Sequence, residues 1–273
     1  MEDLPDNLAG WLAYLSRADI PVLRQTAREI ERLHGTADAG HLNAHSIADV
    51  VDNDPLMTVK LLRYMQTHKH RSQQHELVEN EQAILMMGFD TFFARVGTGT
   101  TCDALLKAHP EALVQLLGTV RRAQRAAHYA HDWAMRLHDM HMEEVRVTAL
   151  LSHYSEMFMW CFNPEVMHDI RKMQEADKTL RSADVQKQML GFTGRELQAA
   201  LNTKWHMPEL LLALADAEQA ENPRVRNVLL AVDLARHSAH GWDDAALPDD
   251  YDKIAELLRL DSGQVIKLVQ RPD

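Results

Sequence analysis

The sequence contains 16 histidines in 273 residues, a frequency that draws attention to metal chemistry. Three pairs are three or four residues apart, a spacing that puts two imidazoles on one face of a helix, as a zinc site requires. The pairs are His41 with His45, His128 with His131, and His138 with His141. None forms the HExxH motif, and no acidic third ligand stands at the companion spacing. We interpret them as surface or interhelix pairs and keep adventitious metal binding as the alternative.

Three His-Asp dipeptides also place an imidazole next to a carboxylate. They are His131-Asp132, His138-Asp139 and His168-Asp169. The first two lie in a polar predicted helix or at its exit, and the third follows Pro164 in a charged stretch. Because the chain is rich in both residue types, we interpret the dipeptides as chance matches.

Other reactive residues lack the neighbours that their chemistry needs. Residues 97–100, Gly-Thr-Gly-Thr, have no lysine to reach a phosphate and no preceding strand, so we interpret them as a flexible linker rather than a nucleotide loop. No GxSxG elbow marks a serine nucleophile, and an all-helical chain is an unusual host for a Ser-His-Asp triad. Cys102 and Cys161 are far apart and have no CxxC partner, which indicates neither a zinc site nor a disulfide framework and fits a reducing compartment.

Composition indicates a folded, acidic protein. Hydrophobic residues make up 46% and charged residues 25%, which argues against wholesale disorder. The net charge of −11 argues against nucleic acid as the principal partner. Two basic clusters, residues 69–71 and the arginines 121, 122 and 125, are interpreted as solvated helix faces, with anion binding as the alternative.

Neither the first residues nor the most apolar stretch indicates a membrane. The first ten residues, MEDLPDNLAG, are acidic and lack the apolar segment of a secretory signal. Residues 147–162 are interrupted by polar side chains and are too short to span a bilayer. We therefore expect a cytoplasmic protein that does not enter a membrane.

Helices must position these residues, because alternating β-branched runs are absent and Ala, Leu, Met, Glu, Arg and Gln dominate. We expect an all-α protein. Predicted helix starts in the first part of the chain are Pro21, Ser46 as an N-cap, and Asn53 or Asp54 as an N-cap with Pro55 in the first turn. The first of these helices is predicted to break in the loop 35–40. A helix over residues 81–87 is predicted to end at Gly88, and residues 89–101 form a candidate boundary region.

In the rest of the chain, Pro110 is predicted to start the longest helix. Residues 145–162 are apolar almost all round, so we expect them at the centre of a second bundle. The remaining predicted features are a capping box of Thr193 and Glu196, helices opened by Pro208 and Pro223, and two short helices joined at Asp261. We interpret the last two helices as a bundle-closing cap and keep a helix-turn-helix DNA reader as an alternative.

Four segments in this order resemble the HDOD family, regulatory relatives of the HD phosphohydrolases found mainly in bacteria. The segments are residues 20–23, Ile-Pro-Val-Leu; residues 47–63, with an Asp-Pro step and a Leu-rich helix; residues 83–88, Ala-Ile-Leu-Met-Met-Gly; and residues 191–201, followed by Trp205 and Pro208. Together they cover about residues 20–240. The positions that serve the fold by starting, packing or ending helices are Asp54, Pro55, Leu61, Leu62, Gly88, Trp205 and Pro208.

The resemblance implies a multi-helix bundle. In it an N-terminal helical subdomain, residues 1–100, packs on a degenerate HD-like helical bundle, residues 101–245. A C-terminal helical cap, residues 246–273, completes the expected domain organisation.

The chain departs from the active HD pattern where metal would be held. Active relatives have Leu-Leu-His-Asp before a glycine, whereas residues 150–153 are Leu-Leu-Ser-His. Ser152 thus replaces the histidine ligand and His153 replaces the aspartate, which removes the carboxylate that would bridge two cations. Asp233 stands near the place of the superfamily's last aspartate, and residues 214–216 stand where a His-His pair is often found. The resemblance therefore implies no metal, no cofactor and no catalysis.

The expected function is regulatory. The resemblance implies a protein that binds signalling proteins in trans, in two-component or cyclic-dinucleotide networks, with a small-molecule or nucleotide ligand in the vestigial HD pocket as a further option. A homodimer is compatible with this expectation. The alternatives are a metal-dependent phosphohydrolase or phosphodiesterase with ligands drawn from His128, His131, His153 and Asp233, and a DNA-binding regulator that uses the C-terminal helices.

Overall fold

The computed structural model describes residues 4–35, 42–68, 79–177, 179–213, 219 and 221–270. In these segments the chain is helical, apart from turns, 3-10 pieces such as η3 (Ser238–His240), and an isolated parallel bridge between Val22 and Thr101. The predicted all-α fold class is therefore confirmed. None of the helices in this part of the chain is long and apolar enough to cross a membrane.

Contacts divide the chain into two compact units, each made of two stretches of sequence. The first unit is Met1–Val120 with His153–Pro208, and the second is Arg121–Ser152 with Glu209–Asp273. One boundary falls inside the long helix α8 (Pro110–Arg136), so the units are interleaved along the chain. The sequence instead predicts three contiguous segments, 1–100, 101–245 and 246–273, and that division stays a prediction.

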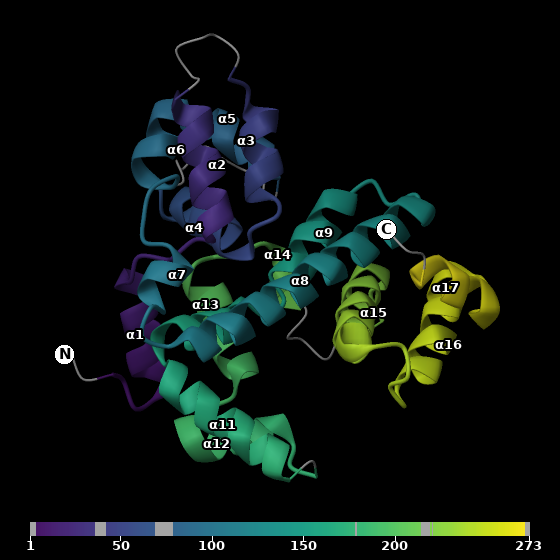
Figure 1. Cartoon of the computed structure of the whole chain (residues 1–273). Coiled ribbons are helices and arrows are strands. Elements are labelled where there is room, and N and C mark those ends of the chain that lie inside the picture. Colours follow the sequence, from purple (N-terminus) through teal and green to yellow (C-terminus); the bar gives the residue numbers. More distant parts are fainter. Residues whose placement is uncertain are drawn as a thin grey trace. The chain divides into compact units, whose positions relative to one another are not determined.

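The first unit contains two groups of helices and the first part of α8 (Figure 1). The N-terminal helices are α1 (Leu8–Arg17), α2 (Arg24–Gly35), α3 (Ala44–Val51), α4 (Pro55–Thr67), α5 (Asn80–Met87), α6 (Phe89–Arg95) and α7 (Cys102–Leu105). The later helices are α10 (Tyr154–Phe162), α11 (Pro164–Ala176), α12 (Ser182–Leu190) and α13 (Gly194–Lys204).

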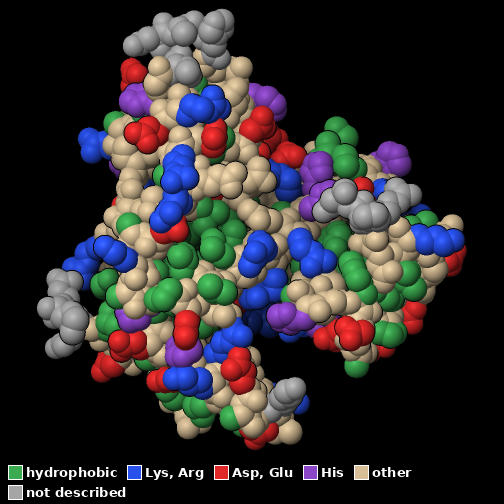
Figure 2. All heavy atoms as spheres, viewed as in Figure 1, with side chains coloured by type: hydrophobic (Ala, Val, Ile, Leu, Met, Phe, Trp, Pro, Cys, Tyr) green, Lys and Arg blue, Asp and Glu red, His purple; other side chains and the backbone are tan. Residues whose placement is uncertain are grey.

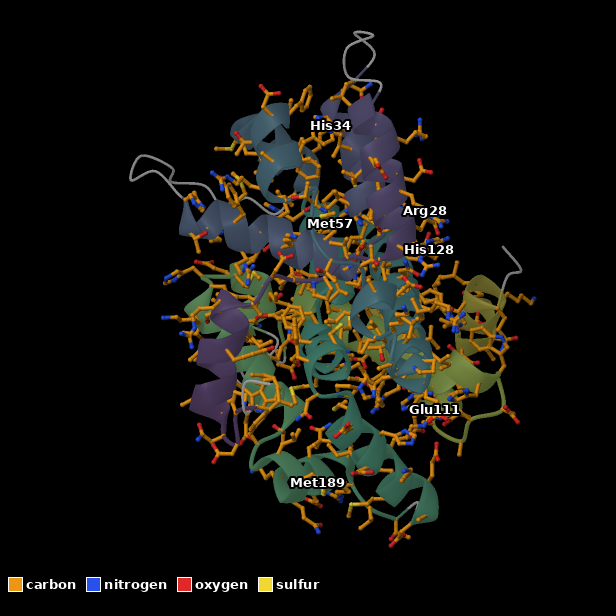
Figure 3. All side chains as sticks on the ribbon, turned by 60° about the vertical axis from the view of Figure 1, so that its left-hand side comes forward. Arg28, His34, Met57, Glu111, His128 and Met189 are labelled. Carbon is orange, nitrogen blue, oxygen red and sulfur yellow. The ribbon has the colours of Figure 1, made fainter. Side chains whose placement is uncertain are left out.

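Helices α2, α3, α5 and α6 run alongside one another above α4 (Figure 1). Their shared interior is apolar, and Ile47, Met57 and Leu61 in it are fully buried. Figure 3 shows Met57 among these crowded side chains, whereas Arg28 lies at the outer surface of α2. Burial of this shared face, rather than helix propensity alone, stabilises such short helices.

Two predicted helix starts in this unit are wrong, the first because of a contact distant in the chain and the second for a local reason. Val22 is held in extended backbone, since its N–H donates to the Thr100 carbonyl (3.1 Å) and its carbonyl accepts from Cys102 N–H (2.9 Å). For this reason α2 begins at Arg24 rather than at Pro21.

The N-cap of α3 is Asn43, whose Oδ1 accepts from the N–H of Ser46 (2.8 Å). The Ser46 hydroxyl donates to the same oxygen (2.9 Å), so the residue predicted as the cap lies in the first turn of the helix.

The predicted boundary region after Gly88 is instead mostly helical. Gly88 has a positive φ of 78°, which ends α5 as expected from a glycine. The next helix, α6, begins at once and buries Phe92 and Phe93 against the same apolar interior. The aromatic pair therefore keeps residues 89–95 in the first unit, although Gly97, Gly99 and several threonines follow.

Residues 145–162 form two helices rather than one central segment. Helix α9 (Met142–Leu150) belongs to the second unit, and α10 (Tyr154–Phe162) belongs to the first. The break falls at residues 151–153, where the Ser152 hydroxyl donates to the carbonyl of Thr148 (2.9 Å). Such a bond from a side chain to a carbonyl four residues earlier is typical of serine near a helix end.

The second unit consists of the rest of α8, α9, α14 (Glu209–Ala213), α15 (Pro223–His237), η3, α16 (Leu247–Leu258) and α17 (Ser262–Val269). Helix α15 packs on α9 and α16, and α16 packs on α17. The predicted starts at Pro110 and Pro223 are confirmed. Asp261 joins α16 to α17 and forms a capping box with Gln264.

Candidate functional site

The residues that the sequence predicts at degenerate HD positions lie in or near the ends of helices. Ser152 is partly buried and its hydroxyl is bonded within α9, while His153 is exposed at the start of α10. Asp233 lies on α15, where its carboxylate accepts from the Arg236 guanidinium (2.7 Å) and its side chain is 43% exposed. The carboxylate is thus held at the surface by a neighbouring cation.

These residues do not fit a metal centre of the HD type. A neutral serine hydroxyl stands in the place of an imidazole, and a histidine stands in the place of the bridging carboxylate. Across the described segments, no three His, Cys, Asp or Glu side chains come together as a metal would need. Of the alternative ligand set, His128, His131 and Asp233 belong to the second unit, whose described residues contain no such group of three, and His153 belongs to the first.

The three His-Asp dipeptides have ordinary structural surroundings. Their aspartates form ion pairs, Asp132 with Arg136, Asp139 with Arg224, and Asp169 with Lys172. Partial burial acts to raise the pKa of Asp139, but hydrogen bonds from the Arg224 guanidinium (2.8 and 2.9 Å) and the His141 N–H outweigh it and leave that pKa below its usual value. The surroundings support the interpretation of the dipeptides as chance matches.

One histidine of each described pair lies near a carboxylate. The Nε2 atom of His131 lies 3.0 Å from Glu143, and the Nδ1 atom of His141 lies 3.8 Å from Glu144. His138 has a positive φ of 55° just beyond the end of α8. His45 lies near Asp49 and Glu81, and its predicted companion His41 is outside the described residues.

Asp54 connects two of the segments that carry the family resemblance. It is fully buried, and its Oδ1 accepts from the N–H groups of Leu56 (2.9 Å) and Met57 (3.1 Å) as the N-cap of α4. Its Oδ2 accepts from Leu23 N–H (2.9 Å) across 31 residues of chain. Burial raises the pKa of Asp54, and these backbone donors oppose that effect.

The other fold positions are packed as expected. Pro55 is the first residue of α4, and Leu61 and Leu62 are both fully buried. Trp205 stacks on Tyr154 with ring centroids 6.0 Å apart, and Pro208 is buried directly before α14, which begins at Glu209. These side chains hold helices together and are not available for chemistry.

A hollow of about 390 Å³ in the first unit gathers charged side chains that sequence analysis did not connect. Its cations are Lys60 and Arg63 from α4, Arg95 from the end of α6, and Lys204 from the end of α13. Asp19 supplies the one carboxylate in the lining, and Trp205 supplies an indole. Figure 3 shows α1 and α4 on the same side of the molecule, where part of this lining lies.

Lys60 and Arg63 are fixed by hydrogen bonds. The Lys60 side chain is only 6% exposed, and its Nζ lies 2.9 Å from an Asp19 oxygen and donates to the Thr98 carbonyl (2.6 Å). Arg63 Nη1 donates to the carbonyls of Leu15 (3.2 Å) and Ala18 (3.0 Å). Its guanidinium lies 5.4 Å from the Trp205 ring centre. Burial lowers the pKa of Arg63, and Asp19 opposes that effect.

The Gly-Thr-Gly-Thr loop is held by this lysine, so it is not a free linker. Gly99 has a φ of +145°, and a Cβ there would lie 2.6 Å from Lys60 Nζ and 2.8 Å from Asp19. The loop presents the Thr98 carbonyl to the lysine rather than N–H groups to an anion. This geometry agrees with the prediction that the loop does not bind a phosphate. The loop instead positions the Lys60 ammonium group.

The comparisons with known proteins agree with this architecture. The family model for the HDOD domain matches residues 20–221. This chain belongs to the HDOD domain family. No curated protein sequence matches the chain significantly.

Solved structures with the same fold as this HDOD protein include one from Methylococcus capsulatus and one from Campylobacter jejuni. The MmoQ response regulator from Methylococcus capsulatus superposes with a TM-score of 0.70 at 16% identity, over 94% of this chain and 100% of the other. A virulence factor from Campylobacter jejuni superposes with a TM-score of 0.67 at 16% identity, over 95% of this chain and 96% of the other. At this identity the likeness shows the fold alone.

Part of the basic hollow was visible in the HDOD motif itself. Lys60 and Arg63 are about one helical turn apart within a mostly apolar helix, a position where a cation needs a polar or charged partner. Arg95 and Lys204 carry no such signal. Of the basic clusters noted in the sequence, residues 69–71 are outside the described residues, and Arg125 bonds to Ser238 and Tyr129 in the second unit.

The two cysteines of this HDOD chain meet in the first unit, which their spacing did not predict. Both are buried, and neither forms a disulfide. A hydrogen bond with the Cys161 thiol, together with burial, raises the pKa of Cys102 well above its ordinary value. The thiolate that would act as a nucleophile is therefore strongly disfavoured.

We expect both thiols to resist a disulfide reagent in the folded protein. With 5,5′-dithiobis(2-nitrobenzoate) at pH 8, labelling should be at least about 100-fold slower in buffer than in 8 M urea, because the folded protein must first open. Absorbance at 412 nm measures the rate, and the urea sample should release two equivalents for the two free thiols. Rapid release of one equivalent from the native protein would contradict the burial.

Proposed function

We propose that this protein is a non-catalytic, cytoplasmic regulatory protein that acts by binding other signalling proteins. Its partners are proposed to belong to two-component or cyclic-dinucleotide networks. Membership of the HDOD family supports this, as does the fold shared with a protein described as a response regulator. A homodimer is compatible with the proposal.

The proposal rests mainly on the two residues that stand where an active relative would have the His-Asp dipeptide. Residues 152 and 153 are Ser and His, and they lie in the break between α9 and α10 with the serine hydroxyl bonded to Thr148. The carboxylate of Asp233 is engaged by Arg236 at the surface. A pair of bound cations needs bridging carboxylates, which this arrangement does not offer.

Exposed methionines at the corner between α8 and α9 suit a partner-binding role. Met140 is 89% exposed, and Met135, Leu137 and Met142 are also exposed nearby in sequence. Unbranched, polarisable side chains of this kind adapt to differently shaped apolar surfaces and are used at promiscuous binding sites. We propose this corner, residues 135–142, as the main contact region.

The test uses the full chain as bait in its native cell, followed by binding measurements with each purified candidate. Met140→Glu is expected to weaken a true partner at least tenfold, since a charge would replace an apolar contact of about 1.4 kcal/mol or more. Leu85→Glu is the matched control, because Leu85 is also exposed but lies on α5 in the other unit. If Met140→Glu and Leu85→Glu bound the partner with equal affinity, residues 135–142 would not be the main contact region.

Metal analysis tests the non-catalytic part separately. The protein purified without chelators is expected to contain far less than one metal ion per chain and to leave bis(p-nitrophenyl) phosphate and cyclic dinucleotides intact. Stoichiometric metal together with phosphodiester hydrolysis that EDTA abolishes would establish the enzyme alternative instead. Salt-dependent binding to duplex DNA would favour the DNA-binding alternative.

A further inference from the structure

We propose that the basic hollow formed by Lys60, Arg63, Arg95 and Lys204 binds a small molecule through a phosphate group. The site lies within the first unit and shares no residue with the degenerate HD positions or the proposed partner-binding corner. The proposal therefore stands apart from the proposed regulatory function.

The charge of the lining is opposite to that of the protein. The chain carries a net charge of −11, and acidic and basic side chains are interspersed over the face shown in Figure 2. The lining of the hollow instead has four cations and one carboxylate, Asp19. A concave surface of one sign focuses the electrostatic potential and attracts ligands of the other sign.

Two of the cations are arranged before any ligand arrives. Lys60 is buried and held by Asp19 and the Thr98 carbonyl. Arg63 is held by two backbone carbonyls through Nη1 and by the Trp205 ring, which leaves the N–H groups of its other nitrogens for a ligand. Because both side chains are already ordered, binding an anion here costs little conformational entropy.

The other two cations have no competing acid in the described residues. Arg95 and Lys204 are exposed at the rim, and neither has an ion pair or hydrogen bond with the described part of the chain. Guanidinium and ammonium groups that converge from separate helices match the three or more acceptor oxygens of a phosphate. These two side chains can close on the phosphate without breaking an existing contact.

The size of the hollow favours a small molecule over a polymer. Its volume of about 390 Å³ lies in the range of ordinary ligand pockets, roughly 300–1,000 Å³. The hydroxyls of Ser16 and Thr67 and the stacked rings of Tyr64 and His68, 4.0 Å apart, complete the lining. These groups offer hydrogen bonds and a flat apolar surface to the organic part of a phosphate ester.

Replacing Asp19 is predicted to strengthen phosphate binding, whereas replacing a cation of the hollow is predicted to weaken it. Its carboxylate neutralises Lys60 and is 55% exposed, so an incoming phosphate competes with it for the ammonium group. Asp19→Asn removes this competition and one negative charge from the lining. It is expected to tighten phosphate binding by about threefold or more, which mere damage to the fold would not do.

The experiment measures binding of inorganic pyrophosphate and of adenosine monophosphate to the full chain by isothermal titration calorimetry, in 150 mM NaCl with EDTA. Saturable 1:1 binding is expected for at least one of the two. The double variant Arg95→Gln/Lys204→Gln is expected to weaken it at least tenfold for each removed cation, since a charge-assisted hydrogen bond contributes about 1.5 kcal/mol or more. Arg28→Gln/Lys107→Gln is the matched control, because it removes the same charge from exposed residues outside the hollow.

Each outcome decides the question. Loss of binding in the first double variant but not in the control, with tighter binding in Asp19→Asn, supports the proposal. Equal weakening in both double variants would show a general charge effect and overturn it. Absence of saturable binding to either probe, or binding only to a long polyanion such as a 30-nucleotide single strand, would also overturn it.

Discussion

Asp54→Ala is expected to lower the free energy of unfolding by about 3 kcal/mol. The N-cap bonds to Leu56 and Met57 would be lost, which typically costs about 1 kcal/mol. The partly buried N–H of Leu23 would also lose its acceptor, and leaving that donor unsatisfied costs about 1–2 kcal/mol more. The same carboxylate therefore stabilises the start of α4 and the extended segment before α2.

Urea denaturation followed by circular dichroism measures this loss. Asp54→Asn is the matched variant, because asparagine caps a helix as well as aspartate does but presents an amide group as well as an oxygen to the surrounding donors. Its single oxygen can accept from Leu56 and Met57 but not from Leu23 as well, so we expect it to cost about 2 kcal/mol. If Asp54→Ala cost no more than Asp54→Asn, the N-cap bonds to Leu56 and Met57 would not contribute as the structure indicates.

Asp54 should also give stability a recognisable dependence on pH. Because burial raises the folded pKa above the ordinary value of 3.8, the folded protein keeps a proton that the unfolded chain has already lost. The stability that this proton contributes is fully present below pH 3.8, and it is lost as the pH rises through the pKa of Asp54 in the folded protein. In Asp54→Asn that decline is expected to be absent.

Trp133→Ala is expected to destabilise the second unit by about 4 kcal/mol, within the range measured for emptying a buried aromatic site. Trp133 is fully buried on α8, and Tyr129 stacks on it with ring centroids 5.9 Å apart. It packs in the same apolar cluster as Ala231 and Leu234 of α15. Alanine would leave a cavity that these helices can only partly close.

The variant Trp133→Phe distinguishes the contribution of ring packing from that of the indole nitrogen. The indole Nε1 of Trp133 is buried and has no hydrogen-bond partner among the described residues, so its removal relieves an unfavourable burial while most of the ring volume remains. We expect a cost of about 1 kcal/mol for Trp133→Phe, measured by the same urea titration. Equal losses of free energy of unfolding for Trp133→Phe and Trp133→Ala would contradict this account of the indole nitrogen.

Local sequence signals predicted the helices well because a cap acts within one turn. Asp54 with Pro55, Thr193 with Glu196, Pro110 and Pro223 all start helices as expected. Apart from the N-cap of α3, the errors in helix position came where a distant contact overrides the local signal. Val22 is extended because it pairs with Thr100 and Cys102, and residues 89–95 are helical because two phenylalanines enter an apolar interior.

The candidate site likewise has features that residue identity predicts and features that only tertiary packing creates. The replacement of His-Asp by Ser152-His153 is read from residue identity, and it stays a prediction from the sequence. The hollow depends on Asp19, Lys60, Arg95 and Lys204, which are distributed over about two thirds of the chain and belong to no common motif. The meeting of the Cys102 and Cys161 thiols has the same origin, since only packing brings such distant residues together.

The sequence was thus sufficient to specify an all-α HDOD chain and most of its helix starts, because each depends on residue types or on contacts within a few residues. Tertiary packing alone created the basic hollow, the break that separates α9 from α10 into different units, and the double role of Asp54. These features arise from hydrogen bonds and burial between segments that lie far apart in the chain, and no local pattern records such contacts.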